Sequence, residues 1–311
     1  KGSGFFSGEE FLDIVQYAQD RYITIVPEID TPGHTNAALA SYPDLNCDGE
    51  ARDLYTGTEV GFSVFCVEKE YVYEFLEDVV RDIASVSPGP FFHVGGDEVH
   101  LLPDPEFNAF IERMAGIVEA NGKRLVGWEE VAKAELSGES VIQLWRPLWP
   151  AEGAAPLDSA RAEAAAELQD GVDRALEKGA SVILSPADRL YLDMKYSEST
   201  PIGLTWAGIA DVRTSYDWVV TDIFGTIPEE AIAGVEAPLW SETIATMADI
   251  EYLAFPRLAG VAEIGWSSED KRSWDDYRIR LGAQGPRWTA MGINFFRSPL
   301  VPWSDGFPGE H

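Results

Sequence analysis

In several parts of this chain, apolar residues recur every three to four positions. This spacing predicts a series of helices. The first helix follows Ser7, which has the spacing of a capping box with Glu10, and its apolar face runs from Phe11 to Ala18. The same spacing predicts further helices over residues 72–83, 107–118, 158–178, 247–264 and 274–290.

Short apolar runs rich in β-branched and aromatic residues lie between these helices. They predict six strands, over residues 23–26, 91–94, 125–128, 141–145, 181–185 and 235–240. Strands that alternate with helices form parallel βα units, and barrels of such units place functional residues at one end of every strand. Polar or aromatic residues do follow each predicted strand. The pattern therefore predicts an α/β protein of the (β/α)8 TIM-barrel type, with six βα units in this chain.

The strand at 91–94 leads directly into Gly95-Gly96-Asp97-Glu98. The glycines would let the backbone approach a ligand closely. Adjacent residues of an extended chain point in opposite directions, so Asp97 and Glu98 can have different surroundings, with one carboxylate ionised and the other acting as a general acid. The alternative is a chance acidic pair, because the chain has 53 Asp and Glu residues.

The other strand ends carry aromatic rings and carboxylates, which together are typical of a sugar pocket. The C–H faces of a pyranose pack on indole rings, and carboxylates accept hydrogen bonds from hydroxyl groups. Any one of the tryptophans could instead belong to the core. The residues concerned are Asp30, Asp97, Glu98, Trp128, Trp145, Tyr191, Asp193, Trp240 and Glu242.

Metal binding is the competing use of the region around residue 97. It would recruit His93, Asp97, Glu98 and His100, but these four residues do not have the spacing of a known ligand motif. We therefore expect no metal and no other cofactor.

The charge of the chain excludes two classes of partner. With 23 basic and 53 acidic residues the formal net charge is −30, which disfavours binding to nucleic acid or to an anionic membrane. No apolar stretch approaches the ~18 residues of a membrane span, and the first residues lack the charged and then apolar pattern of a signal peptide.

Cys47 and Cys66 are the two cysteines, and they lie in one acidic, turn-rich loop. A disulfide between them would stabilise the fold by roughly 3 kcal/mol on the chain-entropy model and would favour an oxidising compartment. Two buried thiols are the alternative.

Five stretches of the chain, in order, resemble the glycoside hydrolase family 20 β-N-acetylhexosaminidases, particularly the secreted bacterial members. The likeness runs from about residue 4 to residue 297, and the loop with Cys47 and Cys66 is similar to the disulfide loop of bacterial members. The five stretches are Tyr17-Ala18-Gln19-Asp20-Arg21-Tyr22-Ile23, residues 26–34, residues 93–98, Tyr191-Leu192-Asp193 and Trp240-Ser241-Glu242.

The resemblance implies a retaining, substrate-assisted mechanism in which the 2-acetamido oxygen of the sugar attacks the anomeric carbon and forms an oxazolinium ion. It implies that Glu98 is the general acid and base, that Asp97 orients the acetamido N–H and that Tyr191 donates to the acetamido oxygen. The remaining roles that it implies are enclosure by Trp128, Trp145 and Trp240, hydroxyl binding by Asp193 and Glu242, and support by Asp30, His34 and His93.

The resemblance also implies that residues 1–311 are a partial catalytic barrel domain that holds strands 3–8. Family members begin the barrel with two further strands, which carry an arginine and an aspartate of the site, after a small N-terminal α/β domain. We expect the complete protein to be secreted and to act on oligosaccharides that end in N-acetylglucosamine or N-acetylgalactosamine, such as chitin fragments. The alternatives are a non-catalytic or partner-dependent sugar-binding fragment and a relative similar to lacto-N-biosidases.

Overall fold

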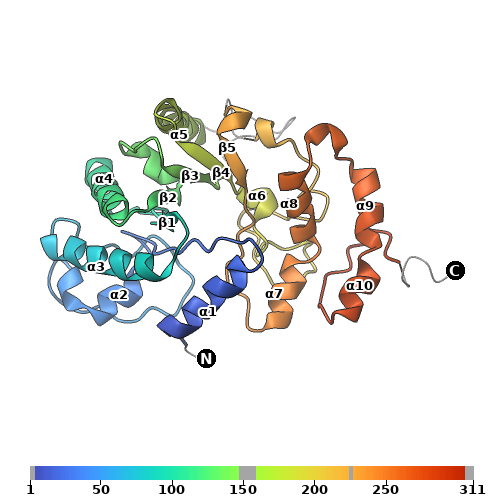
Figure 1. The fold of residues 1–311 in the computed structure, drawn as a ribbon, viewed down its shortest axis with the longest axis horizontal. Coiled ribbons are helices and arrows are strands. Elements are labelled where there is room, and N and C mark those ends of the chain that lie inside the picture. The colour runs from blue at the N-terminus through green and yellow to red at the C-terminus, as the bar shows by residue number, and fades with distance from the viewer. Residues whose placement is uncertain (1–3, 147–158, 224–226, 305–311) are drawn as a thin grey trace. The chain divides into compact units, whose positions relative to one another are not determined.

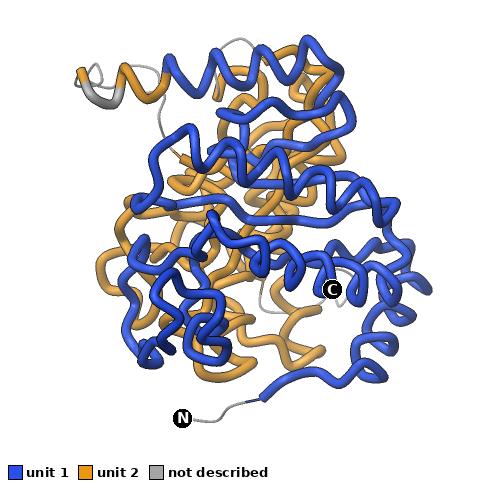
Figure 2. Tube along the Cα trace, turned by 90° about the vertical axis from the view of Figure 1, so that its left-hand side faces the viewer, with its two compact units in different colours: residues 1–143, 166–181 blue, residues 144–165, 182–311 orange. Residues whose placement is uncertain are grey.

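A computed structural model describes residues 4–146, 159–223 and 227–304 of the chain (Figure 1). The chain divides into two compact units (Figure 2). The first contains residues 1–143 and 166–181, and the second contains residues 144–165 and 182–311.

Three parallel strands form the centre of the first unit. Strand β1 (Phe91–His93) pairs with β2 (Arg124–Trp128), which pairs with β3 (Val141–Leu144). Phe92, Leu125 and Ile142 on these strands are almost completely buried. Parallel strands that are covered on both faces have continuous apolar sequences, which is why three of the six sequence-based strand predictions lie within one residue of these strands.

The helices of the first unit end where local sequence signals place their ends. Helix α1 (Gly8–Gln19) begins with the predicted capping box, in which Ser7 N donates to Glu10 Oε2 at 2.8 Å and Glu10 N donates to Ser7 Oγ at 3.2 Å. Helix α4 (Asp104–Ala120) ends before Gly122, whose φ of 72° suits glycine. The other helices are α2 (Asn36–Ser41), α3 (Glu70–Val86) and α5 (Ser159–Glu177), the last with residues in both units.

The second unit has two parallel strands and a large aromatic core. Strand β4 (Ser181–Leu184) pairs with β5 (Ile232–Val235). In the core, the rings of Tyr216 and Tyr277 stack at 3.8 Å between centroids. The helices of this unit are α6 (Ala187–Leu190), α7 (Met247–Ala254), α8 (Arg257–Trp266), α9 (Trp274–Gly282) and α10 (Gly285–Ala290).

The strands are hydrogen-bonded in chain order, β1-β2-β3-β4-β5. The prediction of a strand over residues 23–26 is wrong. The backbone pairing with β1 lies further along the chain, where His93 N donates to Pro27 O at 2.9 Å and Thr31 N donates to Val94 O at 2.9 Å. Only one isolated bridge, between Glu28 and His93, is formed in this segment. Ile23 is half exposed. The β-branched residues around it favour a strand, but the fold does not pair this segment with a neighbouring strand.

Proline accounts for three other differences from the predicted elements. The strand predicted over residues 235–240 shares only Val235 with the observed strand β5, and Pro238 in the predicted range has no N–H for a ladder. The helix predicted over 247–264 is divided between α7 and α8 at Pro256. The helix predicted over 274–290 is divided in the same way, with Pro286 in the first turn of α10. Among the described residues, no helix is both long enough and apolar enough to cross a membrane.

Candidate active site

The loop after β1 brings three acidic residues and a histidine of the first unit together. Gly95 and Gly96 have φ angles of 72° and 101°, and Gly96 N donates to Asp30 Oδ1 at 3.1 Å. A Cβ on Gly95 would lie 1.8 Å from Asp30 Oδ1. Glycine is therefore required at position 95 for both its conformation and its small size, and it allows Asp30 to reach the loop that carries Asp97 and Glu98.

His34 contacts both residues of the predicted catalytic pair. Its Nε2 lies 3.2 Å from Glu98 Oε2 and 3.5 Å from Asp97 Oδ2. The other carboxylate oxygen, Asp97 Oδ1, is buried and has no hydrogen-bond partner among the residues that the structure describes. His34 and Glu98 have φ angles of 55° and 54°, a conformation that is uncommon outside glycine and is often found at functional sites.

The protonation of this centre follows from its crowded charges. Hydrogen bonds first to Asp97 and then to Glu98 raise the pKa of His34 to about 10, because both stabilise the imidazolium. Burial, together with the negative charge of Asp97, raises the pKa of Asp30 well above its ordinary value. At neutral pH the centre therefore holds a positively charged His34 beside Asp97 and Glu98.

His93 lies next to this centre, but its pKa is shifted in the opposite direction to that of His34. Its Nδ1 accepts a hydrogen bond from Gly95 N at 3.0 Å, and burial lowers its pKa to about 4, so the ring is neutral. The indole of Trp128 meets the His93 ring edge-on at 5.2 Å and donates from Nε1 to Glu28 Oε1 at 3.0 Å. Glu28 was not among the predicted site residues, although its place at the start of a strand-end motif was a usable signal.

The structure brings together a metal-ligand set other than the predicted alternative. Asp30, His34 and Asp97 each offer one ligand atom, and these atoms lie within 4.8 Å of one another. The set of His93, Asp97, Glu98 and His100 is not brought together in this way in the described part of the chain. In this structure His34 Nε2 faces carboxylate oxygens of both Asp97 and Glu98, which is the geometry of an ion-paired histidine.

In the second unit, the aromatic residues predicted at strand ends gather around Tyr191. Its ring is nearly parallel to that of Trp145 at 6.3 Å and tilted against that of Trp240 at 6.4 Å. Trp206 completes the group, at 5.9 Å from Trp145 and 5.7 Å from Tyr191. We call these four residues, Trp145, Tyr191, Trp206 and Trp240, the aromatic cluster.

Trp206 is a candidate site residue that the sequence did not reveal. It lies in an irregular segment between β4 and β5, so no strand end pointed to it. Its side chain is 53% exposed although it contacts two other aromatic rings. A large exposed ring at the edge of such a cluster is suited to contact with a ligand.

Asp193 is a buried carboxylate beside the aromatic cluster. Its Oδ1 accepts a long hydrogen bond from Trp240 N at 3.5 Å, and its buried Oδ2 has no partner among the described residues. Burial raises the pKa of Asp193 to about 6, and the negative charge of Glu242 adds to the shift. Glu242 thus lies close enough to act on Asp193, and its side chain is exposed.

A buried arginine on α8 holds the backbone on both sides of Asp193. Arg257 is 1% exposed, and its guanidinium lies 3.9 Å from the centre of the Tyr196 ring. Four of its hydrogen bonds go to main-chain oxygens. The acceptors are Leu192 O at 2.5 Å and Met194 O, Ala210 O and Leu253 O, each at 2.9 Å.

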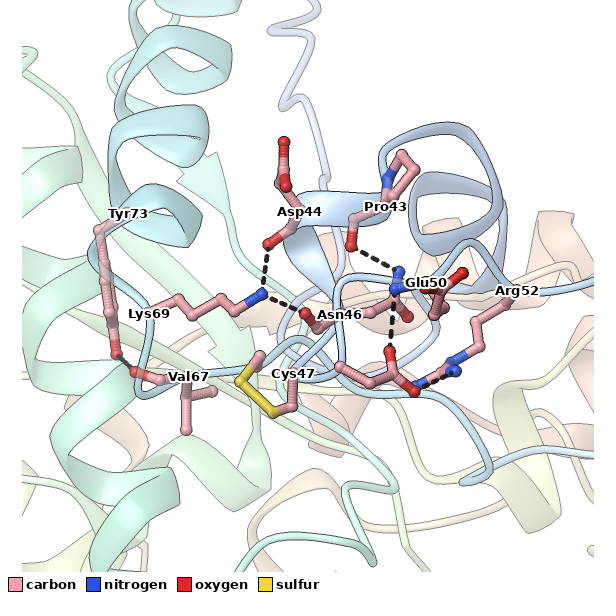
Figure 3. The surroundings of a disulfide bond; sticks show 11 residues. Pro43, Asp44, Asn46, Cys47, Glu50, Arg52, Val67, Lys69 and Tyr73 are labelled. Carbon is pink, nitrogen blue, oxygen red and sulfur yellow. Dashed lines mark hydrogen bonds and ion pairs between the residues drawn. A yellow bond between two sulfur atoms is a disulfide. The ribbon is translucent and has the colours of Figure 1, made fainter.

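The predicted disulfide between Cys47 and Cys66 is present in the first unit (Figure 3). The ammonium group of Lys69 donates to the main-chain oxygens of Asp44 and Asn46, which lie just before Cys47. Tyr73 on α3 donates from its hydroxyl to Val67 O at 2.8 Å, just after Cys66. Both ends of the cross-linked loop are thereby attached to the region where α3 begins.

Residues 1–269 match the model of the glycosyl hydrolase family 20 catalytic domain. The chain belongs to glycosyl hydrolase family 20. Its fold class is therefore the TIM barrel predicted from the sequence, although the five strands among the described residues form an open sheet rather than a closed barrel.

Named relatives agree with this assignment. A β-N-acetylhexosaminidase of Cellulomonas fimi is 38% identical over 300 residues, which cover 96% of this chain and 57% of that protein. The solved structure of the family 20 β-N-acetylhexosaminidase of Streptomyces coelicolor A3(2) matches with a TM-score of 0.89 and 46% identity, over 98% of this chain and 59% of that one. A mutant Streptomyces plicatus β-hexosaminidase in complex with its product GlcNAc has the same TM-score at 47% identity, with 98% and 58% covered. This chain thus spans somewhat more than half the length of these relatives.

Proposed function

We propose that the protein containing this chain is an exo-acting β-N-acetylhexosaminidase that removes terminal N-acetylglucosamine or N-acetylgalactosamine with retention of configuration. The observation that carries the proposal is the arrangement of Asp97. One of its oxygens contacts His34, and the other, Oδ1, is buried and has no hydrogen-bond partner among the described residues. A buried acceptor without a donor is unfavourable unless a ligand supplies one, and the N–H of a 2-acetamido group is such a donor.

In this proposal Asp97 accepts the acetamido N–H and turns the acetamido oxygen toward the anomeric carbon. The bond from that oxygen to the anomeric carbon forms while the bond to the leaving oxygen breaks, and Glu98 gives its proton to the leaving group. The negative charge of Asp97 balances the positive charge that develops on the oxazolinium ring. Water then attacks the anomeric carbon, Glu98 takes its proton, and the bond to the acetamido oxygen breaks.

The positions of the neighbouring residues support these roles. His34 Nε2 lies 3.2 Å from Glu98 Oε2 and 3.5 Å from Asp97 Oδ2, so it can orient the Asp97 carboxylate and the side chain of Glu98. Asp30 and His93 hold the loop before Asp97 through the N–H groups of Gly96 and Gly95. Oriented acceptors cost less reorganisation in the transition state than mobile ones.

The second unit supplies the groups to which we assign sugar binding. Tyr191 donates to the acetamido oxygen, and the exposed parts of Trp206 and Trp240 present apolar faces to the sugar ring. Asp193 and Glu242 accept hydrogen bonds from hydroxyl groups of the terminal sugar. The resemblance assigns enclosure of the acetyl group to Trp128 and Trp145. A secreted protein is the setting that the disulfide supports, because disulfides persist in oxidising compartments.

The proposal is tested with the full-length protein, p-nitrophenyl-GlcNAc and a thiazoline mimic of the oxazolinium ion. We expect the first sugar released to be the β-anomer by NMR. We also expect the thiazoline to bind at least about 10²-fold more tightly than GlcNAc, because it resembles a high-energy state. Asp97→Asn removes the negative charge and reduces this preference. A preference that Asp97→Asn leaves unchanged, or equal affinity for the thiazoline and for glucose, contradicts substrate assistance.

A further inference from the structure

The loop of residues 61–66 lies against both segments that carry the charged centre of the first unit. Val64 forms a bridge with Gly33, and Phe65 N donates to Pro32 O at 3.0 Å, so this side of the loop holds the backbone before His34. At its other end, a Cβ on Gly61 would lie only 3.1 Å from Glu98 O. The loop therefore packs against the main chain just before His34 and against that of Glu98.

Within this loop, Ser63 contacts the residue that directly follows His34. The Oγ of Ser63 accepts a hydrogen bond from Thr35 N at 3.1 Å. Thr35 also donates from its own hydroxyl to Pro32 O at 3.2 Å. Ser63 and Thr35 are 9% and 5% exposed, so water has little access to replace either bond. The short turn from Pro32 to Thr35 is thus fixed at both ends, with His34 between them.

This fixation matters because His34 has an unfavourable backbone conformation. Its φ of 55° is in the left-handed region, which non-glycine residues occupy only where the surroundings impose it. Without the Ser63 hydroxyl, the buried N–H of Thr35 loses its acceptor, which is unfavourable. The turn can then recover part of this loss by relaxing toward an ordinary φ angle. That relaxation would move the imidazole away from Asp97 and Glu98.

We propose that Ser63 is a positioning residue for the reaction, which acts by holding the backbone of His34 so that its imidazole reaches both Asp97 and Glu98. The catalytic part of this inference rests on the proposed function, but the geometric part does not. The charged groups recorded as acting on the His34 ring are Asp30, Asp97 and Glu98, and all of them are acidic. A displaced imidazole therefore loses the interactions that favour its protonated form.

The first measurement follows the His34 ring itself by side-chain nitrogen NMR during a pH titration of the full-length protein. The chain has four histidines, and His34→Gln identifies the signal. We expect Ser63→Ala to lower the pKa of His34 toward its ordinary value. Ser63→Thr keeps the hydroxyl and is expected to stay close to wild type. Ser85→Ala removes an exposed hydroxyl that donates to Asp82 O within α3, and it serves as the matched control.

The second measurement is the hydrolysis of p-nitrophenyl-GlcNAc by the same variants. We expect Ser63→Ala to lower kcat by roughly tenfold while KM changes by less than about twofold, because small misplacements of catalytic groups reduce turnover more than binding. Ser63→Cys has nearly the same shape but only a weak acceptor. It is expected to shift both kcat and the His34 titration in the same direction by a smaller amount, and it replaces Ser63→Ala if that variant fails to fold.

The outcomes separate this inference from the proposed function. A Ser63→Ala or Ser63→Cys protein that loses thermal stability but keeps the wild-type His34 titration and kcat overturns the inference, because Ser63 would then be structural only. A wild-type protein that does not hydrolyse the substrate overturns the proposed function, while the NMR titration still decides whether Ser63 positions His34.

Discussion

The charged centre of the first unit and the aromatic cluster of the second are built in different ways. Asp97, Glu98 and His34 meet through two short polar contacts, and two of these residues have left-handed backbones. The cluster around Tyr191 is instead built from rings whose centroids lie 5.7–6.4 Å apart. Packed rings lose stabilisation gradually when one is removed, whereas the proton transfer proposed for the charged centre would fail when one group is lost. Substitutions in the charged centre should therefore cause a large loss of activity, and substitutions in the aromatic cluster should cause smaller losses.

The largest effect is expected for Glu98→Gln, which removes the proton that the leaving group needs. We expect kcat on a chitooligosaccharide to fall by about 10²–10⁴-fold, the usual contribution of a general acid. The loss should be smaller on p-nitrophenyl-GlcNAc, whose leaving group needs little protonation. Glu74→Gln, an exposed residue of α3, is the control. Near wild-type turnover of Glu98→Gln on the oligosaccharide would remove Glu98 from the role of acid.

A smaller effect is expected for Trp206→Ala, which takes one ring from the aromatic cluster. We expect the affinity for GlcNAc to fall by roughly tenfold, which corresponds to the energy of one aromatic contact with its buried area, while kcat changes little. Calorimetry measures the affinity. Trp266→Ala is the matched control, because Trp266 is 91% exposed and is not part of the cluster. Equal losses in the two variants would show that the cluster does not contact the sugar.

The smallest effect is expected from the titration of Asp193. Its carboxyl group has a pKa of about 6 and is ionised above that pH, so the acceptor strength that it offers to sugar hydroxyls declines as the pH falls. We expect the affinity for GlcNAc to decrease by about fourfold between pH 7 and pH 5.5. The same carboxyl group should oppose folding as the pH rises from about 4 to 6, because the unfolded chain releases its proton first.

Asp193→Asn separates this titration from that of other groups. In the variant, the part of the pH dependence that belongs to Asp193 disappears, while any part due to Asp30 or His34 stays. A binding profile that Asp193→Asn leaves unchanged would place the pH dependence in the charged centre rather than beside the aromatic cluster. Comparing the pH profiles of binding for the wild type and for Asp193→Asn therefore shows how much of the pH dependence belongs to each region.

The sequence predicted those parts of the structure that depend on neighbouring residues. The capping box at Ser7, the buried strands β1 to β3 and the Asp97-Glu98 pair all have local signals, and all are found where they were expected. The contact of His34 with both carboxylates joins residues more than 60 positions apart. No pattern in a single sequence measures such a distance, and only the resemblance to a family suggested that His34 was involved.

Other features could not be predicted, because burial decides them. Ile23 and its neighbours have the composition of a strand, yet the main-chain bonds to β1 begin at Pro27. Trp206 follows no strand, so its contact with Tyr191 depends on the path of an irregular segment. Arg257 resembles a solvent-exposed helix residue in sequence, and nothing local shows that four carbonyl groups surround it.

The burial of Arg257 has a consequence for how this part of the chain could tolerate insertions. The guanidinium ties Met194 and Ala210 to the same point, so the two ends of the segment between them are fixed by one cation. The exposed turn around Ser199 therefore belongs to a loop whose two ends are already held in place. Lengthening such a loop adds little to the free energy of folding. Insertions there need not displace Asp193, because Arg257 holds the main chain on either side of it.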